Sequence, residues 1–170
     1  VFILTNRNFT GSVFLTKIKL SMVTRKQIEE FLGSEPIAMA GVSRNPKKFG
    51  FAAFRELKEK GMNVIPVNPY AEEIHGCTVY KDIMSLPDNV RGLIVMTGKN
   101  QTASVIRDAK TKGIKQIWIQ QMAESKEALK ELEGSGINYI TKECILMHYK
   151  PHSIHKFHAG LRKFFGRFPK

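Results

Sequence analysis

Apolar residues along the chain form short continuous runs, and stretches with helical spacing of apolar positions separate these runs. The runs predict five buried strands, at residues 36–42, 62–69, 91–97, 114–120 and 137–140. The stretches between them predict helices, at residues 24–32, 49–61, 100–113 and 125–136. Continuous apolar strands that alternate with helices are typical of a parallel sheet covered on both faces. We therefore expect an α/β fold, a Rossmann-like, doubly wound, five-stranded parallel sheet.

Helix ends are marked by residues with known capping behaviour. Thr24, with Gln27 three residues later, predicts an N-terminal capping box for the first helix, and Gly33 predicts its end. Gly61 and Gly113 predict the ends of the next two helices.

Composition and charge limit the domain organisation. A chain of 170 residues with 42% hydrophobic residues is long enough for one domain with a real core. The formal net charge is +12, but residues 22–143 carry 18 Lys and Arg against 15 Asp and Glu, and both ends lack acidic residues. Basic ends are more often solvated than binding surfaces. We expect an accessory segment at residues 1–21, a ligand-binding domain at residues 22–149 and a basic amphipathic tail at residues 150–170.

Two further observations concern the cellular setting. No apolar run reaches the roughly 18 residues that a membrane span needs, so we expect no transmembrane segment. The only cysteines, Cys77 and Cys144, are too few for a disulfide scaffold and fit a reducing cytoplasmic location.

The loop after the first predicted strand carries the strongest candidate chemistry. In a doubly wound sheet, ligands bind beyond the carboxyl ends of the strands, beside the first strand. Glycine allows close backbone approach, and the N-terminus of the following helix favours an anion. The loop residues that suit a phosphate or pyrophosphate are Gly41, Ser43, Arg44, Lys47, Lys48 and Gly50. The alternative is a plain turn, in which Gly41 ends the strand and the lysines are solvated.

Known nucleotide fingerprints narrow the ligand. The dinucleotide pattern G-x-G-x-x-G and the P-loop pattern G-x-x-x-x-G-K-[ST] are both absent. The second strand ends with Asn68 and Pro69, where an NAD site carries an acidic residue for the ribose. An amide there does not repel a phosphate on the ribose. We therefore expect a nucleotide with more negative charge than NAD.

The stretch "IAMAGVSRNPKKFGFAAFRELKEKGMNVIPVNP" resembles the opening of the small bacterial coenzyme A-binding proteins. These proteins are similar to the CoA-binding domain of succinyl-CoA synthetase. The resemblance continues through "EEIHGCTVY", "IWIQ" and "TKECILMHY" and covers roughly residues 35–149. It implies CoA, or an acyl-CoA, as the ligand.

The resemblance also implies a set of site residues. The phosphate loop would use Gly41, Ser43 and Lys48, and the helix under the pyrophosphate would begin with Gly50 and Phe51. Three later strand ends would supply the rest of the site: Val67, Asn68 and Pro69 beside the adenosine, Met96 and Thr97 at the adenine or ribose, and Trp118 and Gln120 near the pantetheine arm or the pocket floor.

The sequence departs from this family at several positions. Gly50 stands where serine is frequent, and Ile145 and His148 replace a proline and a glutamate that usually follow the cysteine. The part of the synthetase that carries its phosphorylated histidine has no counterpart here, so we expect no catalysis by this chain. Cys144 could pair with a CoA thiol, but a small buried residue is the simpler interpretation. Trp118 on an apolar strand is by default a core residue.

The C-terminal region offers two further interpretations. Four histidines, at positions 148, 152, 155 and 158, suggest a metal, but their spacing matches no closed zinc motif, and we expect none. Apolar residues of the tail have helical spacing and basic residues lie between them, which fits docking on the domain, a membrane surface or weak nucleic-acid binding.

Three functions remain in competition. The first is a CoA-binding module. The second is an NADP- or CoA-dependent enzyme, which needs a general acid or base near the loop. The third is weak nucleic-acid binding through the tail, without a specific nucleic-acid partner. The oligomeric state stays open, a homo-oligomer included.

Overall fold

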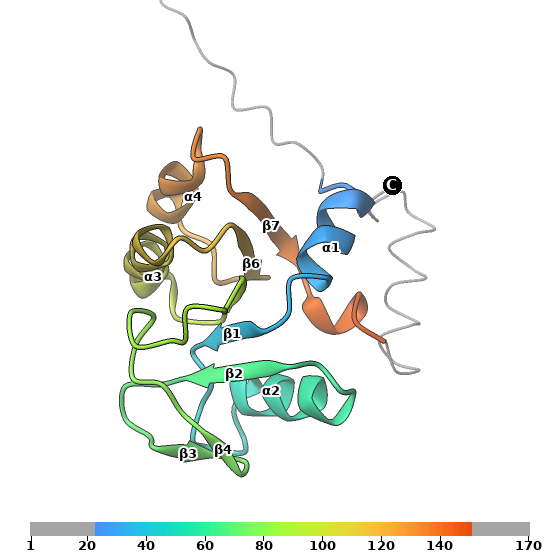
Figure 1. The fold of residues 1–170 in the computed structure, drawn as a ribbon, viewed down its shortest axis with the longest axis vertical. Helices are drawn as coiled ribbons and strands as arrows, with labels where there is room; N and C mark the ends of the chain where they lie inside the picture. Colours follow the sequence, from blue (N-terminus) through green and yellow to red (C-terminus); the bar gives the residue numbers. More distant parts are fainter. Residues whose placement is uncertain (1–22, 151–170) are drawn as a thin grey trace, which may run out of the picture.

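The computed structural model describes residues 23–150. They form a five-stranded parallel sheet with the strand order β2-β1-β5-β6-β7 (Figure 1). Its strands are β1 (Ile37–Ala40), β2 (Val64–Val67), β5 (Gly92–Val95), β6 (Gln116–Gln120) and β7 (Asn138–Glu143). The predicted Rossmann-like α/β fold is therefore confirmed, and each of the five predicted strands is present.

A small antiparallel sheet was not predicted. It consists of β3 (Glu73–Ile74) and β4 (Cys77–Thr78), which follow β2 in the chain. Each strand has two residues, and a segment this short leaves no apolar run that a sequence pattern can detect.

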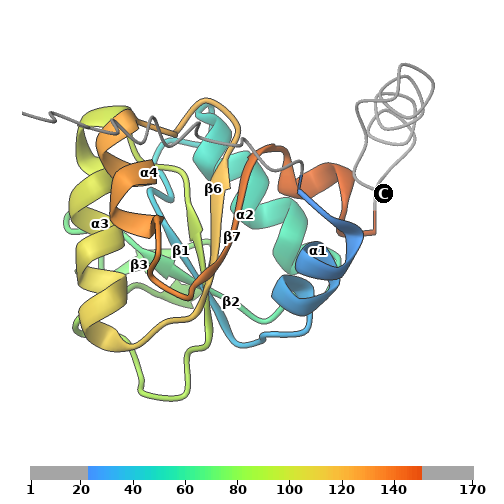
Figure 2. The same cartoon turned by 90° about the horizontal axis from the view of Figure 1, so that it is seen from above.

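Helices cover both faces of the main sheet. The helices are α1 (Arg25–Leu32), α2 (Phe49–Glu59), α3 (Lys99–Lys112) and α4 (Lys126–Leu132), followed after β7 by the short 3-10 helix η1 (Ile145–Met147). Figure 2 shows α1 and α2 on one face of the sheet and α3 and α4 on the other. This arrangement explains why the strands are continuous apolar runs, since neither face meets water.

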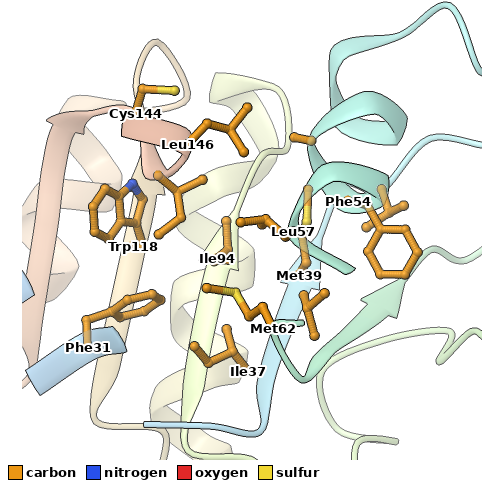
Figure 3. Close-up of a cluster of buried hydrophobic side chains, with 14 of the residues drawn as sticks. Phe31, Ile37, Met39, Phe54, Leu57, Met62, Ile94, Trp118, Cys144 and Leu146 are labelled. Carbon is orange, nitrogen blue, oxygen red and sulfur yellow. The ribbon is translucent and has the colours of Figure 1, made fainter. Parts of the chain in front are cut away.

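Successive residues of β1 illustrate the two-sided burial. Ile37 and Met39 belong to the core under α1 and α2, while Ala38 and Ala40 belong to the core under α3 and α4. All four are at most 3% exposed. Figure 3 shows the first of these cores, in which side chains from α1, α2 and the strands pack together. The small alanines on the other side leave room for the helices there.

The predicted helix caps are present. The Thr24 hydroxyl oxygen accepts the Gln27 N–H, and the Gln27 side chain accepts the Thr24 N–H, which completes the capping box. Gly113 ends α3 with a φ of 83°. Gly61, with a φ of 86°, follows Lys60, the residue that caps α2.

The end of β1 and the start of α2 approach each other through two glycines. Gly41 has a φ of 91°, and a Cβ on it would lie 2.7 Å from the Met96 carbonyl carbon. A Cβ on Gly50 would lie 2.5 Å from the Gly41 carbonyl oxygen. Both positions therefore require glycine, and only glycine lets the first turn of α2 rest against the end of β1.

Several expectations concern other parts of the chain. Residues 1–21 and residues 151–170 of the basic tail lie outside the described residues, so the accessory role of the first segment and the docking of the tail stay predictions. Within residues 23–150, no helix is both long enough and apolar enough to cross a membrane.

The contact between Gly50 and Gly41 leads to a stability prediction. In the variant Gly50→Ala, the new methyl group would press on a backbone oxygen that cannot rotate away. We expect the free energy of unfolding to fall by about 1–3 kcal/mol, measured by urea denaturation. The better helix propensity of alanine, at most about 1 kcal/mol, does not offset the clash.

Gly33→Ala is the matched control. Gly33 has a φ of −81°, and a Cβ there would meet its nearest atom, the Glu29 carbonyl oxygen, at 3.4 Å. We expect a change within about 0.5 kcal/mol for this control. If Gly50→Ala proved as stable as the unsubstituted protein, the proposed packing of α2 against β1 would be wrong.

Candidate functional site

Three of the predicted groups of site residues meet at the carboxyl edge of the sheet. β1 pairs with β2 on one side and with β5 on the other, so Ala40 lies between Val67 and Val95. The Met96 N–H donates to the Ala40 carbonyl at 2.8 Å, which joins the segments that follow these strands. After β1, the chain forms β2 on one side of β1, and later it forms β5 on the other side. This is the switch point at which doubly wound sheets bind ligands.

Loop 41–50, which comprises the connection after β1 and the first two residues of α2, is held by its own side chains. The Ser43 hydroxyl oxygen accepts the Asn45 N–H at 3.0 Å, and the Asn45 Oδ1 accepts the Lys47 N–H at 2.9 Å. The Lys48 N–H donates to the Asn45 carbonyl at 3.0 Å. Asn45 was not among the predicted site residues, although an asparagine next to a proline is a known turn signal. The bond to Ser43 uses its oxygen as acceptor and leaves the hydroxyl proton for another partner.

The N-terminus of α2 is well suited to an anion. Its N-cap residue, Lys48, has extended backbone angles and makes no side-chain capping hydrogen bond. The first turn of α2 contains no acidic residue. The side chains of Arg44, Lys47 and Lys48 are exposed around this helix end. Free N–H groups, the helix dipole and three cations together create a local positive potential.

α3 begins at the same edge and adds a cation that sequence reasoning missed. Its N-cap residue, Gly98, has no side chain, and its first turn also lacks acidic residues. Lys99 is exposed at this helix end. Lys99 follows β5, and only the strand order, in which β5 lies beside β1, brings this residue to the edge that loop 41–50 occupies.

Two predicted residues near loop 41–50 have clear structural contacts. Phe51 is half-buried and its ring meets the His75 ring edge-on, with 6.0 Å between the ring centroids. Val67 is 5% exposed and belongs to the core under α3 and α4. Phe51 therefore links α2 to the turn between β3 and β4, a role that the sequence did not predict for either ring.

Asn68 and Thr97 reach from the predicted edge to neighbouring loops. The Asn68 Nδ2 donates to the Val42 carbonyl at 2.7 Å. The Thr97 hydroxyl lies 3.3 Å from the hydroxyl of Thr102, which donates to the Ala123 carbonyl at 2.8 Å. Pro69 is exposed and Met96 is half-buried at this edge. The Asn68 contact joins the turns after β1 and β2, and the Thr97–Thr102–Ala123 contacts join the turns after β5 and β6.

Trp118 and Gln120 are buried, unlike the exposed residues at this edge. Trp118 is 0% exposed, and its Nε1 donates to the Glu143 carbonyl at 3.2 Å. Gln120 is 6% exposed, and its Oε1 accepts the Ile145 N–H at 3.2 Å. Figure 3 shows Trp118 within the core beside Phe31. The interpretation of Trp118 as a core residue is confirmed, while ligand contacts for both residues stay predictions that no observed exposure supports.

The region after β7 is also part of the core. Cys144 is 7% exposed, which agrees with the interpretation of a small buried residue. His148 contacts Glu143, with 3.0 Å between Nε2 and Oε2. Within residues 23–150, no group of three or more His, Cys, Asp and Glu side chains could hold a metal ion. The other histidines of the predicted cluster lie outside the described residues.

Large exposed apolar side chains also lie in the segments that follow β1, β2 and β6, and the sequence analysis did not include them among the site residues. Phe49 is 53% exposed at the start of α2, Tyr70 is 75% exposed after β2, and Met122 is 76% exposed after β6. Each follows the carboxyl end of a strand. This edge of the sheet therefore combines positive charge with apolar surface, as a ligand with phosphates and a base or an acyl arm requires.

Comparison with known proteins extends these observations. A family model described as "CoA binding domain" matches residues 35–150. One curated relative, the alpha subunit of acetate–CoA ligase (ADP-forming) II from Pyrococcus furiosus, is 29% identical over 129 residues. That match covers 69% of this chain but only 28% of the relative, so the chain spans less than a third of that relative's length.

Two further relatives have lengths closer to that of this chain. An uncharacterized protein of Bacillus subtilis, YneT, is 24% identical over 123 residues, which cover 72% of this chain and 91% of the relative. The structure of a conserved hypothetical protein from Pyrococcus furiosus superposes with a TM-score of 0.64 and 35% identity, over 66% of this chain and 97% of that one. Because the family model spans most of the chain and the fold agrees with it, this chain belongs to the CoA-binding domain family.

Proposed function

We propose that this chain binds coenzyme A, or an acyl-CoA, at the carboxyl edge of β1, β2 and β5, and that it acts as a binding module without catalysis of its own. The observation that carries this proposal is the α2 N-terminus, which has no capping side chain and no acid in its first turn and is surrounded by exposed cations. Membership of the CoA-binding domain family supports the same ligand.

The pyrophosphate of CoA suits loop 41–50. Oxygens of a diphosphate accept hydrogen bonds from backbone N–H groups at a helix start, and the α2 dipole favours their negative charge. Arg44, Lys47 and Lys48 would add charge-assisted hydrogen bonds. Gly41 and Gly50 carry no side chain, so the end of β1 packs against the backbone of Met96 and Thr97, and the first turn of α2 packs against the Gly41 carbonyl. This packing holds the α2 N-terminus at the edge where the pyrophosphate would bind.

The remaining parts of CoA have matching surfaces nearby. The adenosine would lie beside residues 67–69 and 96–97, with the exposed ring of Tyr70 available to contact the base. Lys99 at the start of α3 would add positive charge for a ribose phosphate. The apolar side chain of Met122 would border the pantetheine arm or an acyl group.

A binding role agrees better with this edge than an enzymatic one. Loop 41–50 contains no histidine, aspartate or glutamate that could act as a general acid or base. The curated relative from Pyrococcus furiosus is named as a CoA ligase subunit, and this chain matches only 28% of it. We infer a CoA-binding module of the kind that a larger ligase would contain. The two cysteines, Cys77 and Cys144, are free thiols, which fits a protein that acts in a reducing, cytoplasmic compartment.

The first prediction concerns the charge of loop 41–50. In the double variant Lys47→Glu with Lys48→Glu, two attractive side chains become repulsive toward the pyrophosphate. We expect the affinity for CoA in titration calorimetry to fall at least about 100-fold, because each lost charge-assisted contact is worth about 1.5–3 kcal/mol. The protein should stay folded, since both lysines are exposed.

Lys115→Glu with Lys130→Glu is the matched control. It changes the net charge equally, and both lysines are exposed: Lys115 precedes β6 at the opposite, amino edge of the sheet, and Lys130 lies in the C-terminal half of α4. We expect the control to bind CoA within about threefold of the unsubstituted protein at 0.15 M salt, because screening shortens the reach of its charges to about 8 Å. Equal affinity in both double variants would contradict the proposed site.

The second prediction separates CoA from a nicotinamide cofactor. We expect CoA to raise the melting temperature of the protein in a thermal-shift titration and NADPH to leave it unchanged at the same concentration. The reason is that loop 41–50 lacks the second and third glycines of the dinucleotide fingerprint. Stabilisation by NADPH but not by CoA would favour the oxidoreductase alternative instead.

A further inference from the structure

Asn68 is bound on both ends of its side-chain amide. Its Nδ2 donates to the Val42 carbonyl at 2.7 Å, and its Oδ1 accepts the Tyr70 N–H at 2.7 Å. Its own N–H donates to the Tyr80 carbonyl at 2.9 Å. Each end of the amide meets a partner of the matching kind, and this determines which end carries the nitrogen. The side chain therefore has one defined orientation, directed toward the loop after β1.

The bond to Val42 fixes the base of loop 41–50. Val42 is 0% exposed and immediately precedes Ser43, the first polar residue of the loop. On the other side, Gly41 packs against the backbone of Met96 and Thr97 at the end of β5. The loop is thus held from the β5 side by close packing, and from the β2 side by Asn68 and by the Gly41 N–H, which donates to the Val67 carbonyl at 3.4 Å. Beyond these two points, the loop is held by the local hydrogen bonds of Asn45.

An amide is required at this position for a simple chemical reason. The Val42 carbonyl accepts a hydrogen bond, and within residues 23–150 the Nδ2 of Asn68 is its donor. A carboxylate has the same shape but only acceptor atoms, so it would place an oxygen against the carbonyl oxygen. The second strand of an NAD-binding sheet ends with such a carboxylate, which binds the ribose. Here the equivalent side chain is already bound to the protein.

We propose that Asn68 is a positioning residue that orients the phosphate-binding loop, and that it does not read the ribose of the nucleotide. The inference rests on the proposed CoA site. In dinucleotide-binding sheets, the side chain at the end of the second strand binds the ribose, whereas here we assign that side chain to the positioning of the loop. Recognition of the ribose and base falls to other groups at this edge, while the strand-end side chain sets where loop 41–50, and with it the α2 N-terminus, lies relative to the ligand.

The first test uses the protein without ligand. Asn68→Asp keeps the acceptor for Tyr70 and removes only the donor to Val42, while Asn68→Ala removes both contacts. In amide hydrogen exchange, we expect both variants to exchange the N–H groups of Asn45, Lys47 and Lys48 at least about tenfold faster. Protection in α3 and β6 should stay unchanged. Unchanged exchange in the loop would overturn the proposal, because a ligand-reading residue does not affect the free loop.

The second test compares two ligands in titration calorimetry, CoA and 4′-phosphopantetheine, which keeps one phosphate of the pyrophosphate and lacks the other phosphate, the ribose with its 3′-phosphate and the adenine. If Asn68 orients the phosphate loop, Asn68→Ala weakens both ligands, CoA by roughly tenfold. If it reads the ribose, only CoA is weakened, and the proposal fails. Asn89→Ala is the control, since Asn89 is exposed in the loop before β5, at the opposite edge.

Failure of the inference and failure of the proposed function give different results. If the unsubstituted protein binds neither ligand, the CoA site is wrong, and the exchange experiment still decides whether Asn68 holds loop 41–50. If the protein binds CoA and Asn68→Ala binds it equally well, the CoA site stands and the positioning role is wrong.

Discussion

The architecture of this edge depends on one close backbone approach, between Gly50 at the start of α2 and the carbonyl of Gly41 at the end of β1. A side chain on Gly50 would come within 2.5 Å of that oxygen. Because the two segments touch without side chains between them, the first turn of α2 lies directly above the sheet. Its N–H groups and the positive end of its dipole are thereby held where the ends of β1, β2 and β5 meet. A bulkier residue would move the helix and the anion site together.

A second constraint acts on the loop that this approach creates. Asn68 and the residues at the end of β5 hold its base, and Asn45 holds its tip through hydrogen bonds to the backbone of Lys47 and Lys48. A loop with these contacts is arranged before any ligand arrives. Preorganisation of this kind reduces the ordering cost of binding, so more of the attraction between cations and phosphates appears as affinity.

The side of the sheet formed by β6 and β7 contributes packing to the core. Trp118 packs between the rings of Phe31 and His148, and its N–H is satisfied by the carbonyl of Glu143. Gln120 is also buried and bonded to the backbone after β7. These side chains join α1, β6 and η1 into the core under α1 and α2. Both side chains therefore contribute to packing, and the ligand contacts that the resemblance to CoA-binding proteins implies for them stay predictions.

The sequence by itself determined the order and type of every element of the main sheet, because strands buried on both faces must be continuously apolar and helix ends need recognisable caps. It also located the cationic glycine loop after the first strand. Only the tertiary structure decided which strand ends are neighbours, and therefore that Lys99 and Tyr70 share the edge with that loop. It also decided that the Trp118 side chain is buried in the core and that the amide of Asn68 faces Val42. Contacts between residues distant along the chain depend on strand order and packing, and no local pattern encodes them.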